Sequence, residues 1–126
     1  MNRTTFAICL LVVLLGLCIL SSVLVRQYSQ TVNDAIAASR AQAARNDFGG
    51  AADHLQEAKA LWRSHERYFG VVLSHSEIDD VNMMFAELAQ YAELGDQDDF
   101  LAGTARLIAT IEHIREMELP SYHNLL

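Results

Sequence analysis

The sequence predicts an all-α protein in which an N-terminal transmembrane helix continues into a small antiparallel bundle of two helical hairpins. Three observations predict it. Residues 6–25 are apolar and carry no charge, apolar residues then recur every three and four positions, and no run alternates as a strand would. The predicted divisions are a short head (1–5), an anchor (6–25), a juxtamembrane helix (26–46) and a helical bundle domain (47–126).

The apolar segment, residues 6–25, has the length of a membrane span. Twenty residues at about 1.5 Å each give about 30 Å, the thickness of a bilayer's hydrocarbon core. It is longer than the apolar part of a signal peptide, and Ser21-Ser22 lacks an A-x-A-like cleavage pattern. We therefore favour an uncleaved anchor over a cleaved signal or a lipid anchor at Cys18. A short head is usually retained inside, which favours a C-terminal domain outside the cytoplasm.

The next two helices follow from composition and spacing. Residues 26–46 are rich in Ala and contain no Pro or Gly, so the anchor helix is expected to run on through them. The sequence Asp47-Phe48-Gly49-Gly50 is the first turn signal. A second helix is predicted over roughly 51–73, with an apolar seam whose largest contributor to burial is Trp62.

Two more helices complete the predicted bundle. Ser76 and Asp79 resemble a capping box at the start of a helix that runs to Leu94. Gly95 is expected to end that helix and Asp96 to cap the next, which covers about 97–118 with Pro120 just past its end.

A faint internal repeat links the two hairpins. The pattern D-F-x-x-A-x-x-x-L at residues 47–55 recurs as D-F-x-x-G-x-x-x-L at residues 99–107, an offset of 52. It resembles half of a tetratricopeptide repeat, but its period is too long for that family. Two helical hairpins, faintly tetratricopeptide-like, are therefore the safer expectation.

The charge of the chain lies after the apolar segment. All 16 Asp and Glu, but only seven of the nine Lys and Arg, follow residue 26. A surface this acidic disfavours nucleic acid and anionic headgroups, and it fits a basic protein partner. Both cysteines, Cys9 and Cys18, lie in the apolar segment, so the domain has no disulfide framework and no thiolate site.

One cluster of side chains is a candidate metal site. His75, Glu77 and Asp79 lie near a predicted helix start, where a flexible first turn would present all three to one ion. His113 and Glu116 share a face of the last helix and would complete it. The plainer interpretation, which we favour, is a capped helix start and a surface His–Glu pair.

No motif in the sequence predicts an enzyme or a cofactor. His65-Glu66 begins like a zincin helix but lacks the second histidine, and Glu-x-x-His, G-x-S-x-G and phosphate-loop motifs do not occur. We therefore expect no enzymatic activity and no cofactor.

Several stretches together resemble a known family. They are Trp62, H-S-E-I-D-D-V at 75–81, Gly95-Asp96, and the closing stretch 107–126. They are similar to small bacterial membrane proteins described only as domain of unknown function 4363. The resemblance implies an anchored, all-helical protein and carries no activity, and it draws attention to the His75–Glu77 turn and to residues 118–124.

Two hypotheses of function follow. The first is a non-enzymatic protein-interaction or assembly domain, tethered to the cell membrane by a single span, with Trp62, Tyr68 and Phe69 as contact residues. The alternative is a sensor domain that binds a metal or small ligand through His75, Glu77, Asp79 and His113. The sequence leaves the partner and the oligomeric state open.

Overall fold

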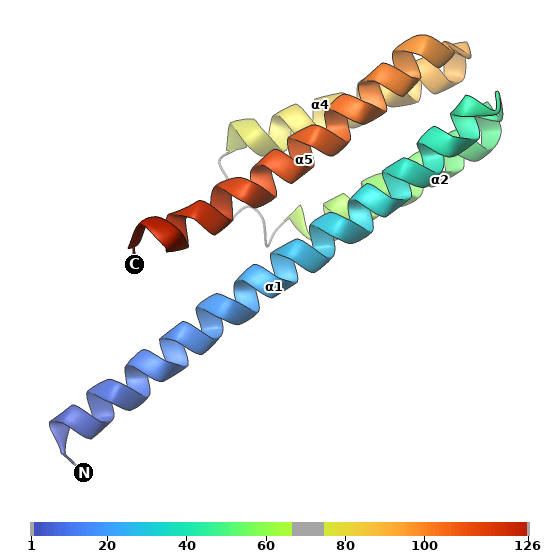
Figure 1. Cartoon of the computed structure of the whole chain (residues 1–126). Helices are drawn as coiled ribbons and strands as arrows, with labels where there is room; N and C mark the ends of the chain where they lie inside the picture. The colour runs from blue at the N-terminus through green and yellow to red at the C-terminus, as the bar shows by residue number, and fades with distance from the viewer. Residues whose placement is uncertain (1, 67–74, 126) are drawn as a thin grey trace.

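The protein is an all-α chain of four helices over the residues that the structure describes. The structure, a computed structural model, describes residues 2–66 and 75–125, of which Val25, His75 and 117–125 are described by their backbone alone. The helices are α1 (Arg3–Ala44), α2 (Phe48–Ser64), α4 (His75–Leu94) and α5 (Gln97–Leu125). They run up, down, up and down, so that the two short connections lie together at the end far from the N-terminus (Figure 1).

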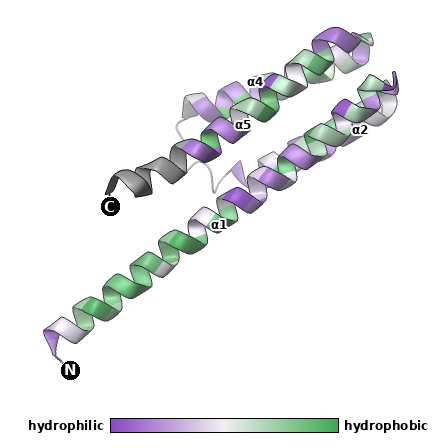
Figure 2. Ribbon diagram, in the orientation of Figure 1, coloured by the Kyte–Doolittle hydropathy of each residue, from purple (hydrophilic) through white to green (hydrophobic). Residues whose placement is uncertain are grey.

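Helix α1 is unbroken over 42 residues, which confirms that the apolar helix continues into the Ala-rich segment. At about 1.5 Å per residue it is about 63 Å long. Its first half extends beyond the other helices, is apolar all round, and has exposed side chains such as Phe6 (63% exposed) and Ile19 (65%) (Figure 2). Burial begins near Tyr28, and Val32 and Ile36 are fully enclosed.

The second half of α1 is one of four core helices. It packs against α2 and α5, while α4 packs against the same two helices from the other side. Trp62, Phe85 and Phe100 are the largest fully buried side chains, which confirms the predicted burial of Trp62. The contact of α1 with α5 closes the bundle between the first and last helices. An open tetratricopeptide-like stack would leave these two helices apart, so that part of the prediction is wrong.

The two connections are built alike, with an offset of 49 residues. Asn46 (φ 62°) and Gly95 (φ 69°) both adopt the left-handed conformation. Asp47 and Asp96 then cap the next helices: their carboxylates accept hydrogen bonds from the backbone N–H groups of Gly50 (3.0 Å) and Asp99 (3.3 Å). The roles predicted for Gly95 and Asp96 are thereby confirmed.

The buried positions follow the same offset of 49. In the first helix of each hairpin, buried residues 29, 32, 36, 39 and 43 correspond to buried residues 78, 81, 85, 88 and 92. In the second helix, buried residues 51, 55, 58 and 62 correspond to 100, 104, 107 and 111. The expected offset of 52 is therefore wrong, because it aligned Phe48 with Phe100 by residue type. Phe48 is the first residue of α2, whereas Phe100 lies one turn inside α5.

The two connections also hold each other in place. The side-chain amide of Gln97 donates to the carbonyl oxygens of Ala43 (3.1 Å) and Ala44 (3.2 Å), the last residues of α1. Phe48 and Phe100 meet edge to face, with ring centroids 6.5 Å apart. The far end of the bundle is thus closed by contacts between the hairpins.

The glycine pair Gly49-Gly50 does not form the turn that was expected there. The turn is made by Arg45 and Asn46, and both glycines lie in the first turn of α2. The reason is capping: Asn46 takes the left-handed conformation, and Asp47 then satisfies a free N–H group at the start of α2.

Three predicted helix ends also differ from the structure. Helix α2 ends at Ser64 rather than near 73, because the Ser64 hydroxyl and the His65 ring bond the carbonyl of Leu61. Helix α4 already includes His75, so Ser76 is not its cap. Helix α5 continues through Pro120 to Leu125; proline's fixed φ suits a helix, at the cost of one backbone hydrogen bond. Residues 67–73 of the predicted second helix lie outside the described residues.

Adjacent glycines in α2 give a matched test of the cap. A Cβ at Gly49 meets only the Asp47 carboxylate, 3.8 Å away, so Gly49→Ala should raise the free energy of unfolding by about 0.5 kcal/mol through helix propensity. A Cβ at Gly50 lies 2.6 Å from Asp47 Oδ2 and 3.2 Å from Gln42 Cδ. Gly50→Ala should therefore displace the Asp47 cap and lower the free energy of unfolding by about 1 kcal/mol.

Urea unfolding of the full-length protein in a neutral detergent, followed by circular dichroism, measures both variants. Equal effects of the two substitutions would contradict the capping role of Asp47.

Candidate functional site

Helical geometry separates one of the three predicted metal ligands at the start of α4, Glu77, from positions 75 and 79, which share a face. Because α4 begins at His75, Glu77 lies on the opposite side of the helix from Asp79, which is exposed. The flexible first turn that was to bring three ligands together is therefore replaced by regular helix. The side chain of His75 lies outside the described side chains.

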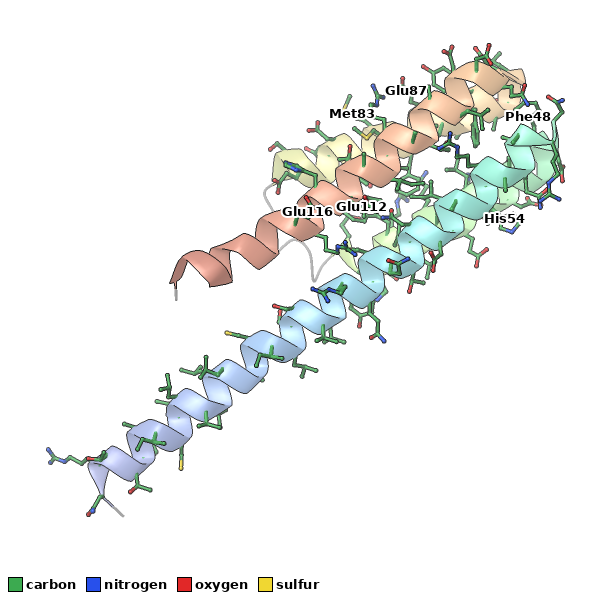
Figure 3. All side chains as sticks on the ribbon, in the orientation of Figure 1. Phe48, His54, Met83, Glu87, Glu112 and Glu116 are labelled. Atoms are coloured by element: carbon green, nitrogen blue, oxygen red, sulfur yellow. The ribbon has the colours of Figure 1, made fainter. Side chains whose placement is uncertain are left out.

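The other two predicted ligands, His113 and Glu116, are exposed on α5. Figure 3 places Glu116 beside Glu112 on the same helix. Among the side chains that the structure describes, no group of three or more His, Cys, Asp or Glu residues is arranged to hold a metal ion.

Of the three predicted contact residues, the described one is buried. Trp62 is 1% exposed and belongs to the core, so its side chain is not part of a surface in this structure. Tyr68 and Phe69 lie outside the described residues. On the bundle itself, the large apolar side chains that the described residues expose lie on α4.

Helix α4 exposes two large apolar side chains to solvent. Beyond the apolar half of α1, Met83 (68% exposed) and Leu94 (67%) are the exposed large hydrophobic side chains of the described residues. They are 11 residues apart, which is three helical turns, so they lie on one line about 16 Å apart. Figure 3 shows Met83 and Glu87 on the side of the α4–α5 hairpin that faces away from α1.

Exposed acidic residues flank this line on both sides. We use the name outer α4 face for the exposed residues Asp79, Asp80, Met83, Glu87, Gln90, Glu93 and Leu94. Four of these seven residues are carboxylates and none is basic. The face thus has one exposed apolar side chain near each end, with Glu87 and Gln90 between them and further carboxylates along its edges.

The net negative charge of the domain comes from the second hairpin. Residues 75–126 contain eleven Asp and Glu but only Arg106 and Arg115 as basic residues, whereas residues 27–74 contain five of each sign. Two hairpins with the same burial pattern therefore differ in surface charge. Because the two hairpins share one burial pattern, their difference in surface charge is not required by the packing of the core.

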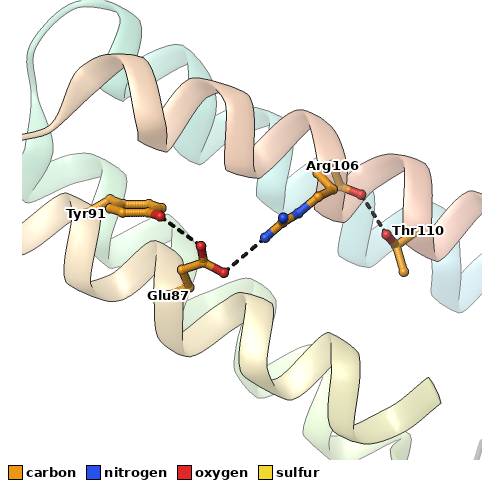
Figure 4. A network of polar contacts seen from close by, with 4 residues as sticks. All are labelled: Glu87, Tyr91, Arg106 and Thr110. Carbon is orange, nitrogen blue, oxygen red and sulfur yellow. Dashed lines mark hydrogen bonds and ion pairs between the residues drawn. The ribbon is translucent and has the colours of Figure 1, made fainter. Parts of the chain in front are cut away.

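Arg106 reaches from α5 to the edge of the outer α4 face (Figure 4). Its guanidinium lies 3.0 Å from Glu87 Oε2, while the Tyr91 hydroxyl donates to Glu87 Oε1 at 2.7 Å. The Thr110 hydroxyl donates to the carbonyl of Arg106 at 2.8 Å. The hydrogen bond to Glu87 is the main cause that raises the pKa of Tyr91 above its usual value. Arg106 and Glu87 are 58% and 43% exposed, so their pairing orients the two groups and adds little stability.

A second set of acidic residues, Asp96, Asp98 and Asp99, lies at the end of the bundle far from the N-terminus. A hydrogen bond to Asp96 and the negative charges of Asp96, Asp98 and Glu87 raise the pKa of the Asp99 carboxyl above its ordinary value. Deprotonation of Asp99 therefore costs more in the folded than in the unfolded state. Its contribution to stability falls as the pH rises from 3.8 through the folded-state pKa.

Polar side chains lie inside the bundle near the end from which the apolar half of α1 extends. The Asn82 amide of α4 donates to Glu66 Oε1 at 3.2 Å, just past the end of α2. The equivalent residues, 49 positions away in each case, are Asn33 and Arg115. Among the described residues, Asn33 Oδ1, Asn82 Oδ1 and Arg115 Nε are buried atoms without a hydrogen-bond partner.

Sequence reasoning missed the outer α4 face and the polar side chains inside the bundle. Met83 and Leu94 do not fall on the apolar seam of their helix, which was the available signal. The repeated Val-Asn pairs, 32–33 and 81–82, were a second signal, since they share the offset of 49.

The two asparagines inside the bundle give a matched pair of substitutions. Asn33→Leu removes a buried acceptor without a described partner, so the free energy of unfolding should rise or stay within about 0.5 kcal/mol. Asn82→Leu also removes the donor to Glu66 and should be less stable than Asn33→Leu by about 1 kcal/mol. Urea unfolding in a neutral detergent compares them. If Asn33→Leu lowered the free energy of unfolding as much as Asn82→Leu, the Asn33 side chain would have to make a hydrogen bond like that of Asn82 to Glu66.

Comparison with known proteins identifies the family and nothing narrower. Residues 19–125 match the family described as domain of unknown function DUF4363, which is most of the chain and includes the end of the apolar segment. No curated protein and no solved structure matches the chain. The expected family is thus confirmed: the chain belongs to the DUF4363 family.

Proposed function

We propose that the chain is a membrane-tethered, non-enzymatic domain that binds a protein partner outside the cytoplasm. The observation that carries this proposal is the continuity of α1. One helix supplies both an apolar half that no other helix covers and a polar half that forms part of the core.

The apolar half of α1 supports the tether. It is long and apolar enough to cross a membrane by length and composition, and none of its most apolar window is buried within the protein. An N-terminal helix of this kind is consistent with a signal anchor or a signal sequence. The anchor is favoured here because α1 has no break at residue 26, where the apolar segment ends.

The surface of the bundle supports a protein partner. The second hairpin is strongly acidic, and its helix α4 leaves Met83 and Leu94 exposed. Exposed apolar side chains surrounded by charge are typical of protein-binding surfaces. The negative charge also keeps the bundle away from anionic headgroups, which suits a domain that stands off the membrane.

Labelling of introduced cysteines in intact cells tests both the tether and its orientation. In a chain with Cys9 and Cys18 replaced by alanine, Gln56→Cys is exposed on α2 and Asn2→Cys is exposed on the other side of the apolar segment. A membrane-impermeant maleimide should label Gln56→Cys in intact cells and Asn2→Cys only after lysis. Both proteins should remain in the membrane fraction after alkaline carbonate extraction.

Two results would contradict the proposal. A protein recovered in the soluble fraction with a new N-terminus after Ser22 would show a cleaved signal. Labelling of Asn2→Cys alone in intact cells would show the opposite orientation.

A further inference from the structure

We propose that the outer α4 face binds a basic amphipathic helix of the protein partner. Met83 and Leu94 would contact the apolar side of that helix, and the flanking carboxylates would pair with its lysines and arginines. This inference rests on the proposed function, since it names the surface and the chemistry through which the domain binds.

The two exposed apolar side chains on α4, Met83 and Leu94, have no role inside the bundle. Helix α4 packs against α5 and α2 through its seam, which includes Val81, Phe85 and Leu88. Met83 and Leu94 lie on the opposite side of the helix and are about two-thirds exposed. A methionine thioether is flexible and polarizable, which suits it to an apolar contact with a partner side chain.

The first hairpin has no equivalent of these two exposed apolar side chains. The positions equivalent to Met83 and Leu94 in the first hairpin are Asp34 and Arg45, which are exposed and charged. The exposed positions between them are Ala37, Arg40, Ala41 and Ala44, none of which is a large apolar residue. The same fold is therefore built without an exposed apolar line, so this line is particular to α4.

The charge of the outer α4 face favours a basic occupant. The outer α4 face carries Asp79, Asp80, Glu87 and Glu93, and the nearest described cation, Arg106, is already paired with Glu87. A second copy of this face would be repelled by like charge, and the first hairpin is neutral overall. Anionic headgroups would be repelled as well. A segment with positive flanks fits all of these charges.

The geometry also sets the pattern of the bound helix. Two apolar contacts about 16 Å apart on one helix are met by apolar residues at i and i+11 of a helix lying along it, with i+4 and i+7 facing the stretch between them that holds Glu87 and Gln90. Lysine or arginine on both sides of that stripe would face the carboxylates.

Peptide binding to the full-length protein tests the surface directly. The protein is placed in nanodiscs of zwitterionic lipid. The probe is a fluorescent 18-residue peptide of Leu, Lys and Ala with leucine at i, i+4, i+7 and i+11 and lysine on both sides. The control peptide has glutamate in place of every lysine, and empty nanodiscs give the background.

Binding should depend on both features of the face. Met83→Ser with Leu94→Ser should weaken binding of the lysine peptide at least tenfold. Asp34→Ser with Arg45→Ser, the matched change at equivalent positions, should alter it less than twofold. Raising NaCl from 50 to 500 mM should also weaken binding. Equal binding of the glutamate peptide, or a loss below twofold for the Met83/Leu94 variant, would overturn the proposal.

Photo-cross-linking in the native host separates this inference from the proposed function. A benzoylphenylalanine placed at Met83 should give an adduct whose cross-linked partner segment carries net positive charge, and one at Asp34 should not. An adduct from Asp34 alone, an acidic partner segment or a second copy of this chain at Met83 would overturn the inference about the face. The membrane tether is tested separately, by the cysteine labelling.

Discussion

The structure depends on the continuity of α1. The apolar half of α1 is not stable in water on its own, because its side chains are exposed all round. The second half of α1 is rich in alanine, and its main apolar contacts are Val32 and Ile36. It therefore needs neighbouring helices to be stable. Packing against α2 and α5 supplies them. Any force on the apolar half is therefore transmitted to the core without an intervening loop.

The repeat of 49 residues explains how a small domain closes around that helix. Each hairpin contributes two helices with the same order of buried positions, and each turns through a left-handed residue followed by a capping aspartate. The two hairpins differ where packing imposes nothing, on their outer surfaces. The acidic charge and the apolar line of α4 are therefore features that the fold permits but does not require.

Local chemistry made much of the fold predictable. Residues 6–25 indicated the apolar helix, the Ala-rich segment its extension, and Gly95 with Asp96 the second connection, because caps and breakers act over a few residues. The turn at Asn46 was missed because a glycine pair is the stronger turn signal. The hydrogen bond from the Gly50 N–H to Asp47 is what places the turn at Asn46 and both glycines in the helix. The exposure of Met83 depends on which sides of α4 the neighbouring helices cover, and a single helix pattern does not contain that information. The predicted metal cluster depended on an irregular first turn, and the structure has a regular one at His75.

The distance between the two halves of α1 tests this account most directly. Spin labels at Leu11→Cys and Ala41→Cys, in a chain with Cys9 and Cys18 replaced by alanine, are both at exposed positions. A continuous helix separates them by about 45 Å along its axis. Double electron–electron resonance in nanodiscs should give a single narrow distribution near that distance. A broad or much shorter distribution would show a hinge between the apolar segment and the bundle, and would contradict the rigid connection on which the account rests.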